Sequence, residues 1–264
     1  MDRVRPRACG RPLRPVPAPR AEKRVMKVLV VGAAGHVGSI VRPALEREHE
    51  CRLFDRRPLP DTNGRCIVGD VNDEALVQQA VQDMDAVIYL AMGIKPGTEK
   101  VCSDIGPAFA VNVVGWYRFL REGLAAGVRR FVYASTLSVY CHRRPERIDE
   151  HVPADAWDPY GISKRQGEAL CQAAARQYPD ATIIVLRMVW PLNEAGWEHQ
   201  KVHRPQVQIQ HFAQGPNDLR RLYLAALACD APGAHIVQTS GDVEGSYCPN
   251  TRATELLGWA PRNE

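Results

Sequence analysis

Tyr160 and Lys164 are the two residues whose types and spacing most clearly suggest chemistry. Because they are four positions apart, they would lie on the same face of a helix. A neighbouring ammonium group stabilises a phenolate and lowers the tyrosine pKa from about 10 toward neutrality. Such a tyrosine can exchange a proton with a hydroxyl or carbonyl oxygen. The pattern occurs by chance in many helices, so its meaning depends on the residues around it.

Hydroxyl-bearing residues precede this pair along the chain. Residues 130–134 are typical of a buried strand, and Ser135 and Thr136 follow directly. A hydroxyl group at the end of that strand can hydrogen-bond the same oxygen atom with which the tyrosine exchanges its proton. The two stretches together predict an acid–base site that acts on a hydroxyl or carbonyl group.

A glycine-rich turn near the start of the chain would bring a nucleotide to such a site. Residues 28–31 predict a strand buried on both faces, and Gly32, Gly35 and Gly38 lead from it into an amphipathic segment over residues 39–48. The first glycine allows a tight turn, the second lets the backbone approach a pyrophosphate, and the third lets the helix pack close to the strand. The same spacing also fits a strand–helix turn that binds no ligand.

A carboxylate follows the second predicted strand. Residues 51–54 lead to Asp55, which lies 23 positions after Gly32, near the offset of about 20 residues at which an acidic residue meets the adenosine ribose. This carboxylate favours NAD, because it would repel the 2′-phosphate of NADP. Arg56 and Arg57 come next and could instead bind that phosphate, or they could belong to a solvated turn.

The remaining elements are less distinctive. Further strands are predicted over residues 65–68, 86–91 and 182–187, and a helix is predicted over residues 108–126. This helix contains Asn112, a poor helix former in an interior position. Its side chain therefore either has a role in the site or faces solvent.

Composition and charge exclude several classes of protein. The chain has 264 residues, 45% hydrophobic and 24% charged, enough for one α/β domain with a small cap. Residues 1–24 carry seven Arg and one Lys against two acidic residues, a net charge of +6. Since the whole chain has a net charge of +4, the remaining residues carry −2. This near-neutral charge gives no sign of a nucleic-acid surface. No apolar run approaches the roughly 20 residues of a membrane span. The eight cysteines contain no C-x-x-C pair, which argues against a zinc site or a redox motif.

The Arg- and Pro-rich composition of residues 1–24 predicts a disordered tail. Alternatively, this stretch reflects the choice of start codon, since Met26 stands where folds of this kind begin. With no apolar core of a secretory signal, we expect a cytoplasmic protein with reduced thiols.

The order of these motifs resembles that of the extended branch of the short-chain dehydrogenase/reductase superfamily, over about residues 27–261. The resemblance implies an α/β fold with a doubly wound parallel sheet (Rossmann) and a small C-terminal substrate cap. It places the NAD-binding domain at residues 25–187 and the cap at residues 188–264, with part of the cap returning to the main sheet. It also implies a homodimer formed through helices near residues 108–126 and 160–176.

The resemblance also implies roles for individual residues. The catalytic residues would be Thr136, Tyr160 and Lys164, and Lys164 would also hold the nicotinamide ribose. The cofactor NAD, with NADP possible, would contact Gly32, Gly35, His36, Val37, Gly38, Asp55, Asp70, Val71, Leu90, Ala91, Asn112, Tyr160 and Lys164. The substrate would contact Met92, Gly93, Ser135, Thr136 and Arg187. Two of these have structural alternatives: Asp70 as a helix N-cap, and Arg187 as half of an ion pair that ties the cap to the body.

The expected substrate is a small molecule. Leu137 and Ser138 stand where sugar-nucleotide dehydratases carry an acidic pair, and 77 residues follow Arg187, fewer than sugar-nucleotide epimerases use to hold a nucleotide. The C-terminal third resembles uronate dehydrogenases, in the stretches Tyr160–Lys164 with Gly167-Glu168, Asp218-Leu219, Asn250-Thr251 and Leu257-Gly258-Trp259-x-Pro261. We expect oxidation of a small sugar, a sugar acid or another secondary alcohol. A sugar epimerase and a non-catalytic NAD-binding regulator are the alternatives.

Overall fold

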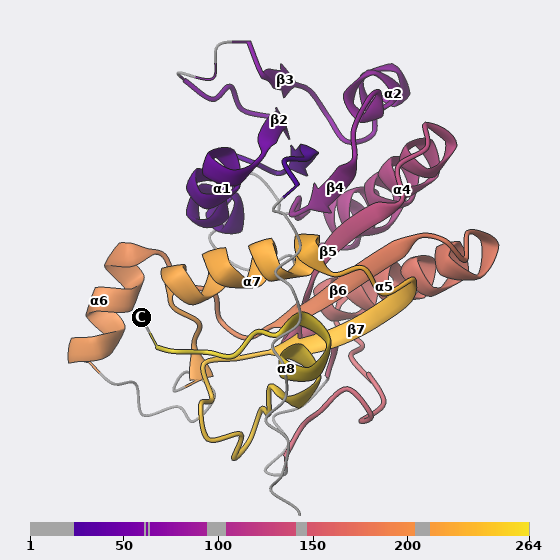
Figure 1. Ribbon diagram of the computed structural model, residues 1–264. Helices are drawn as coiled ribbons and strands as arrows, with labels where there is room; N and C mark the ends of the chain where they lie inside the picture. Colours follow the sequence, from indigo (N-terminus) through magenta and orange to yellow (C-terminus); the bar gives the residue numbers. More distant parts are fainter. Residues whose placement is uncertain are drawn as a thin grey trace, which may run out of the picture.

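A single parallel sheet organises the chain. The computed structural model describes residues 24–60, 62, 64–93, 104–140, 147–203 and 212–263. Within them, seven strands pair in the order β3-β2-β1-β4-β5-β6-β7 (Figure 1). The strands are β1 (Lys27–Val31), β2 (Glu50–Asp55), β3 (Cys66–Val68), β4 (Ala86–Tyr89), β5 (Arg130–Thr136), β6 (Thr182–Met188) and β7 (Gly233–Thr239).

Most of the connections between the strands are helical. The helices are α1 (His36–Glu48), α2 (Glu74–Val81), α3 (Ile105–Phe109), α4 (Trp116–Ala125), α5 (Pro159–Gln177), α6 (Glu194–Val202), α7 (Pro216–Ala228) and α8 (Thr251–Leu257). A π-helical turn, η1 (Ala110–Gly115), joins α3 to α4 without a break, and a 3₁₀ turn, η2 (Leu137–Val139), follows β5.

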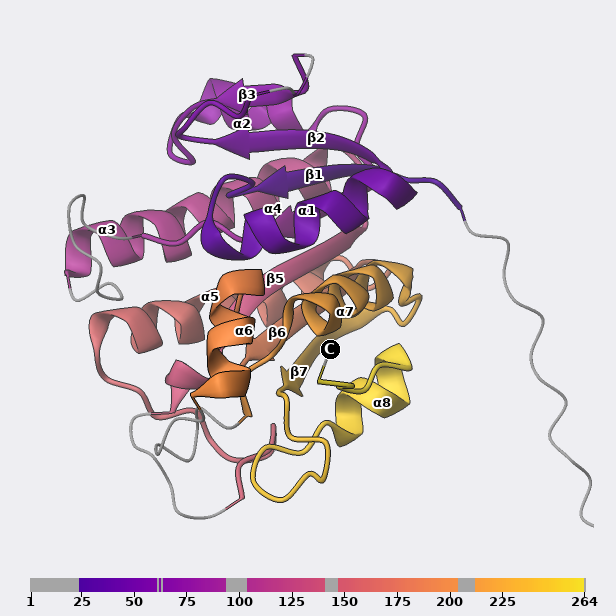
Figure 2. The same cartoon turned by 90° about the vertical axis from the view of Figure 1, so that its left-hand side faces the viewer.

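Strand β1 shows why the sheet is covered on both faces. Val28 and Val30 belong to a core shared with α1 and α7, whereas Leu29 and Val31 belong to a core shared with α2 and α4. All four side chains are fully buried, which agrees with the unbroken apolar run of the sequence. Figures 1 and 2 show α1 and α7 on one side of the sheet and α2 and α4 on the other.

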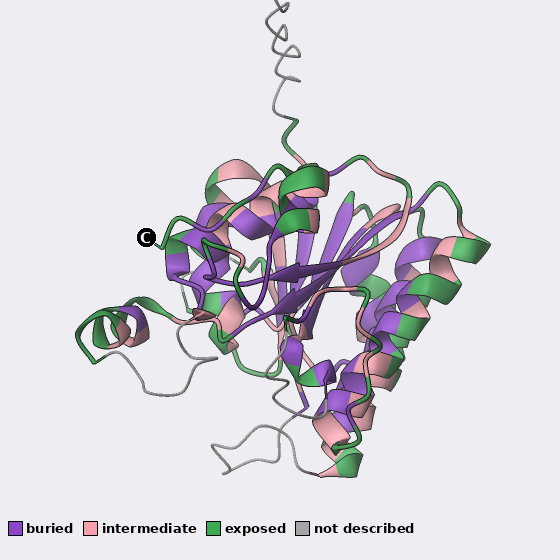
Figure 3. Cartoon of the chain, turned by 90° about the horizontal axis from the view of Figure 1, so that it is seen from below, coloured by how far each residue is buried: buried purple, intermediate pink, exposed green. Residues whose placement is uncertain are grey.

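Helices α1 and α7 pack against each other although they are far apart in the sequence. Arg220 Nε in α7 donates a hydrogen bond to the carbonyl oxygen of Ile40 in α1 at 3.0 Å. Leu222 from α7 and Leu45 from α1 belong to the same buried cluster. Figure 3 shows the buried strands lying between helices whose outer faces are exposed. The core on this face therefore combines the first helix of the described chain with one of its last.

The strand order places a switch point beside β1. From β1 the chain moves outward to β2 and β3, then returns to β4 on the other side of β1. Open α/β sheets bind ligands at such a point, beyond the carboxyl ends of the strands. Gly32 follows β1 there, and the ends of β4, β5 and β6 lie along the same edge because the strands are parallel.

The predicted fold class is confirmed by this architecture. The apolar runs predicted six of the seven strands to within about two residues, and no separate strand was predicted at β7. The turn η1 interrupts the single helix expected over residues 108–126 with a wider turn. Within the region expected to form a cap, β7 pairs with β6 and α7 covers the sheet. The domain boundary at residue 187 stays a prediction, and residues 1–23 of the expected tail lie outside the described residues.

Candidate active site

The glycine turn after β1 forms an open cradle. Gly32 has a φ of +84°, and a Cβ atom there would lie 2.6 Å from the backbone nitrogen of Ala91. A Cβ atom at Gly38 would lie 2.4 Å from the carbonyl oxygen of Gly32. At Gly35 the nearest atom to such a Cβ would be the same oxygen, at 3.1 Å. Thus Gly32 and Gly38 permit the fold itself, whereas the space at Gly35 is available to a ligand.

Helix α1 begins at His36, directly after this turn. The first N–H groups of a helix have no acceptor within the helix, and they attract phosphate oxygens. Leu90 and Ala91 flank the turn from the end of β4, with the N–H of Leu90 bonded to the carbonyl oxygen of Val31 at 2.8 Å. The shape of the turn therefore fits a pyrophosphate, because the backbone at Gly35 is open and a side chain there would occupy the space that the ligand needs.

Asp55 lies beside the cradle at the end of β2. One carboxylate oxygen accepts the N–H of Ala34 at 2.8 Å, and the other accepts the N–H of Arg57 at 3.0 Å. The Arg57 guanidinium donates to the carbonyl oxygen of Ala34 and lies 3.7 Å from the Asp55 carboxylate. An acid suited to a ribose and an exposed cation suited to a phosphate therefore occupy the same rim of the turn.

Asp70 and Val71 follow β3. Asp70 is exposed, and its carboxylate accepts the N–H of Asn72 at 2.8 Å. The N-cap of α2 is Asp73, whose side chain accepts the N–H of Leu76 at 3.1 Å. The alternative that Asp70 caps this helix is therefore wrong, and its carboxylate is held in a turn instead.

Tyr160 and Lys164 occupy the first turns of α5. The helix starts at Pro159 and is capped by Asp158, which accepts the N–H of Gly161 at 2.9 Å. The Lys164 ammonium donates to the carbonyl oxygen of Ala134 in β5 at 2.8 Å. Burial lowers the pKa of Lys164 to about 7, although the nearby Glu168 carboxylate opposes this shift.

Thr136 is the last residue of β5. Its hydroxyl oxygen accepts the N–H of Ser138 at 3.1 Å, which starts the turn η2. The start of α5 packs closely on this turn, because a Cβ atom at Gly161 would lie 2.4 Å from the carbonyl oxygen of Ser138. The structure thus brings the end of β5 and the first turn of α5 together, as the predicted acid–base site requires.

Asn112 lies in η1 and is fully buried. Its side-chain oxygen accepts the N–H of Gly93 at 3.1 Å, and its nitrogen donates to Ser163 Oγ at 2.9 Å. Ser163 Oγ in turn donates to the carbonyl oxygen of Tyr160 at 2.8 Å. The alternative of a solvent-facing Asn112 is therefore wrong, because the side chain ties the loop after β4 to the helix that carries Tyr160.

Ser135 and Arg187, both expected to contact substrate, are bonded to a residue that we did not predict. Ser135 Oγ donates to Glu168 Oε1 at 2.6 Å, and Arg187 binds both carboxylate oxygens of Glu168, at 2.9 and 2.7 Å. Arg187 does form an ion pair, as the alternative interpretation proposed. The pair joins β6 to α5, however, and does not tie the cap to the body. Glu168 could have been found from its spacing, one helical turn after Lys164.

Trp190 marks a bend in the backbone after β6 that was not predicted. It follows β6 with a φ of +40°, a conformation that bulky residues rarely adopt, and its side chain is 48% exposed. Gln214 holds this backbone by accepting the N–H of Leu192 at 3.0 Å and donating to the carbonyl oxygen of Trp190 at 3.2 Å. The His36 ring at the start of α1 contacts the carbonyl oxygen of Pro191 at 2.8 Å. No sequence pattern signals this bend.

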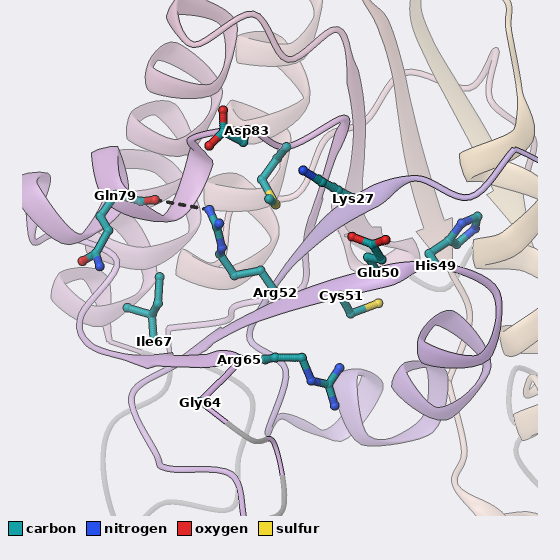
Figure 4. A pocket seen from close by; sticks show the side chains of 11 residues that line it. Lys27, His49, Glu50, Cys51, Arg52, Gly64, Arg65, Ile67, Gln79 and Asp83 are labelled. Carbon is teal, nitrogen blue, oxygen red and sulfur yellow. Dashed lines mark hydrogen bonds between the residues drawn. The ribbon is translucent and has the colours of Figure 1, made fainter.

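A cavity of about 720 Å³ lies at the opposite edge of the sheet (Figure 4). Lys27 and Glu50, which line it, are the first residues of β1 and β2. Arg52 points from β2 to the end of α2, where it donates to the carbonyl oxygens of Ala80 and Gln82 at 2.9 and 2.7 Å. Because ligands of such sheets bind at the carboxyl ends of the strands, we place the active site at the glycine turn and not in this cavity.

The described part of the chain contains neither a candidate metal site nor a candidate membrane-spanning helix. No group of three or more His, Cys, Asp or Glu side chains there is arranged to hold a metal ion. None of the helices in the same residues combines the length and the apolar character that crossing a membrane requires.

Comparison with known proteins supports an enzyme of NAD chemistry. Residues 28–202 match the NAD dependent epimerase/dehydratase family. The L-arabinose 1-dehydrogenase (NAD(P)(+)) of Haloferax volcanii is 27% identical over 259 residues, covering 90% of this chain and 96% of that protein. The glucuronic acid dehydrogenase structure from Chromohalobacter salexigens superimposes with a TM-score of 0.74 at 27% identity, covering 90% and 85% of the two chains. A mutated uronate dehydrogenase gives the same TM-score at 28% identity, covering 90% of this chain and 82% of the other.

Proposed function

Because the chain belongs to the NAD-dependent epimerase/dehydratase family, we propose that it transfers hydride between NAD and a hydroxyl or carbonyl carbon of a small sugar or sugar acid. The observation that carries the proposal is the placement of Tyr160 and Lys164 at the end of β5, along the same sheet edge as the open cradle at Gly35. The Tyr160–Lys164 pair would exchange the proton, and the cradle at Gly35 would hold the redox cofactor.

NAD fits the residues at the rim of the cradle. The backbone at Gly35 and the start of α1 would hold the pyrophosphate, and Asp55 would meet the adenosine ribose. When bound, NAD supplies the carbon that accepts or returns the hydride. NADP remains compatible with this rim, because Arg57 is two-thirds exposed beside Asp55 and could pair with a 2′-phosphate.

In the oxidation direction, the Tyr160 phenolate takes the proton of the substrate hydroxyl group. The Thr136 hydroxyl holds the reacting oxygen atom, and Lys164 favours the phenolate by its charge. The hydride leaves the same carbon atom, so the alcohol loses two electrons and two hydrogens and becomes a carbonyl compound. In the reverse direction, Tyr160 returns the proton to the carbonyl oxygen.

A small substrate is supported by the relatives that span most of this chain, whose names specify arabinose, glucuronic acid and uronate. Met92 and Thr136 lie at the edge where such a molecule would bind. A substrate contact through Gly93, Ser135 or Arg187 would require an exchange of the hydrogen bonds that these residues make to Asn112 or Glu168.

An epimerase is the second candidate, because the matched family is named for both epimerases and dehydratases. The same residues would oxidise the substrate to a ketone, which would rotate within the site or enolise. They would then reduce the ketone again, with no net change in NAD. The two activities therefore differ in whether NADH accumulates.

We further propose a cytoplasmic homodimer formed through α4 and α5. Val114 and Tyr117 are exposed apolar residues, 46% and 50% accessible, at the junction of η1 and α4. Covering them in a dimer would bury this area. The molar mass in solution tests the proposal, since a monomer at micromolar concentration would contradict it.

The formation of NADH at 340 nm tests the proposed activity. Purified protein is mixed with NAD and a panel of aldoses and uronic acids, with Tyr160→Phe as the matched variant. We expect NADH from one class of sugar and a loss of about 10²–10⁴-fold in kcat in the variant. If NAD binds and no panel member yields NADH, the dehydrogenase proposal fails, and conversion of a sugar to its epimer without NADH would favour the second candidate.

A further inference from the structure

A buried ion pair lies directly behind the proposed catalytic pair. The Glu168 and Arg187 side chains are each about 5% exposed, and the guanidinium group contacts both carboxylate oxygens. Arg187 also donates to the hydroxyl oxygen of Tyr140 at 2.6 Å, and Tyr140 donates to the carbonyl oxygen of Asp149 at 2.8 Å. The described contacts therefore satisfy the charge on Glu168 without involving solvent or substrate.

Ser135 connects the ion pair to β5, the strand that ends at Thr136. Glu168 accepts the Ser135 hydroxyl at 2.6 Å, and Lys164, one helical turn earlier, donates to the carbonyl oxygen of Ala134 at 2.8 Å. Helix α5 thus binds two consecutive residues of β5. The next residue is Thr136, so these bonds fix the distance between its hydroxyl group and the first turn of α5.

The ion pair also affects the electrostatic environment of the Lys164 ammonium group. The Glu168 carboxylate lies one helical turn from Lys164 and raises the pKa of its ammonium group, and the Arg187 guanidinium binds both oxygens of that carboxylate. The groups that face this cluster come from every neighbouring element. They are Tyr160 and Cys171 from α5, Tyr133 from β5, Tyr89 from β4 beside Tyr133, Tyr140 after η2, Glu150 beside Tyr140, and Tyr223 from α7 beside Tyr160.

Stability alone is a weak explanation for such a pair. Desolvating two charges costs as much free energy as their attraction returns, so well-packed apolar residues of similar size often serve equally well in a protein interior. A role in the reaction explains why a charge pair stands at this position.

We propose that Glu168 is a positioning residue of the reaction, which with Arg187 as its counter-ion holds the end of β5 against α5 and balances the charge beside Lys164. The proposal rests on the proposed function, because it assigns a task within that reaction.

The charge part of the proposal predicts opposite effects from the two halves of one ion pair. Glu168→Gln removes a negative charge, so protons leave the Tyr160–Lys164 pair more easily and the pH profile of kcat moves to lower pH. Arg187→Met removes the counter-ion of Glu168, so the negative charge beside Lys164 is no longer balanced and the profile moves to higher pH. For Glu168, which lies one helical turn from Lys164, the shift amounts to about one pH unit, and for Arg187 the prediction is the opposite direction. A purely structural role would affect both variants in the same way.

The geometric part is tested by two double variants that contain no ion pair. Glu168→Gln/Arg187→Met keeps an acceptor for Ser135, whereas Glu168→Leu/Arg187→Met has none. We expect kcat to be about tenfold lower in the second than in the first, with similar KM values and similar melting temperatures. Because neither variant leaves an unpaired buried charge, both are expected to fold even where a single variant does not.

The controls separate this proposal from the proposed function. Asp180→Asn breaks the exposed ion pair with Arg129 at the far end of α5 and should leave the pH profile in place. NADH affinity as a function of pH, followed by fluorescence, needs no substrate and reports the charge of Lys164 even if no sugar reacts. Shifts of the same sign in both single variants, or equal kcat values in the two double variants, would overturn the proposal. Absence of activity in the wild type alone would contradict only the proposed function.

Discussion

Alanine at Gly35 and alanine at Gly38 should have different consequences, although the two glycines are only three positions apart at the start of α1. A Cβ atom at Gly38 would lie 2.4 Å from the carbonyl oxygen of Gly32 and 2.7 Å from that of Ala33, and both atoms belong to the backbone. At Gly35 the nearest atom would be 3.1 Å away, and the φ of −73° suits alanine. The first change strains the fold, and the second fills the nucleotide cradle.

The size of each effect follows from these contacts. Overpacking against backbone costs about 1–3 kcal/mol, so Gly38→Ala should lower the melting temperature of the ligand-free protein by about 3–8 °C. In Gly35→Ala, the lower entropy of the unfolded chain contributes about 0.4–1 kcal/mol in favour of folding, which the 3.1 Å contact opposes. Its melting temperature should therefore stay within about 2 °C of the wild type. Its NADH affinity should fall at least about tenfold, or 1.4 kcal/mol.

Thermal unfolding of the ligand-free proteins and fluorescence titration with NADH measure the two quantities separately. Gly106→Ala in α3, where no described neighbour lies within 4 Å of the added methyl group, serves as the control. It should leave the NADH affinity unchanged and should not lower the melting temperature, because the lower entropy of the unfolded chain favours folding by about 0.4–1 kcal/mol. Wild-type NADH affinity in Gly35→Ala would refute the location of the pyrophosphate at this turn. Wild-type stability in Gly38→Ala would show that α1 can move away from β1 at little cost.

Three further predictions concern the rim, the buried asparagine and the buried lysine. Arg57→Ala should lower kcat/KM with NADP more than with NAD, because the carboxylate of Asp55 stays while the nearby cation is lost; equal losses with both cofactors would contradict this. Asn112→Ala should lower the free energy of unfolding by about 1–3 kcal/mol, because it leaves the buried N–H of Gly93 without its acceptor, and wild-type stability in urea would contradict it. The pKa of Lys164 is lowered to about 7, so between pH 7 and pH 10 the unfolded chain binds more protons and stability should rise with pH. Relative to Lys164→Met, the wild type should gain stability across this window, and a constant difference would contradict the shift.

The fold was predictable because its signals are local. The β1 sequence is apolar at successive positions since both faces are covered, and the three glycines mark the turn whose tight contacts the structure shows. The position of Asp55 followed in the same way from its distance to Gly32. Helical spacing placed Lys164 beside Tyr160, and the order of the motifs, which resembles that of the short-chain dehydrogenase/reductase superfamily, implied that the pair lies at the end of β5.

The contacts inside the site were less accessible because distant elements create them. Asn112 could be read as an exposed residue until η1 was seen to turn it toward Gly93 and Ser163. The pairing of Glu168 with Arg187 joins a helix to a strand 19 residues away. The positive φ of Trp190 depends on Gln214, a partner that no local pattern of residues indicates.

The packing of α7 on α1 has a consequence for how the chain must be made. Ile40 and Arg220, which meet across these helices, are 180 positions apart. While the chain grows on a ribosome, α1 and its face of β1 have no cover until α7 has emerged. A nascent chain that ends near residue 187 would present Ile40 and Leu45 to solvent, so the nucleotide-binding half should not fold as an autonomous unit. Chaperone binding to partly synthesised chains should therefore persist until the segment over residues 216–228 has left the exit tunnel.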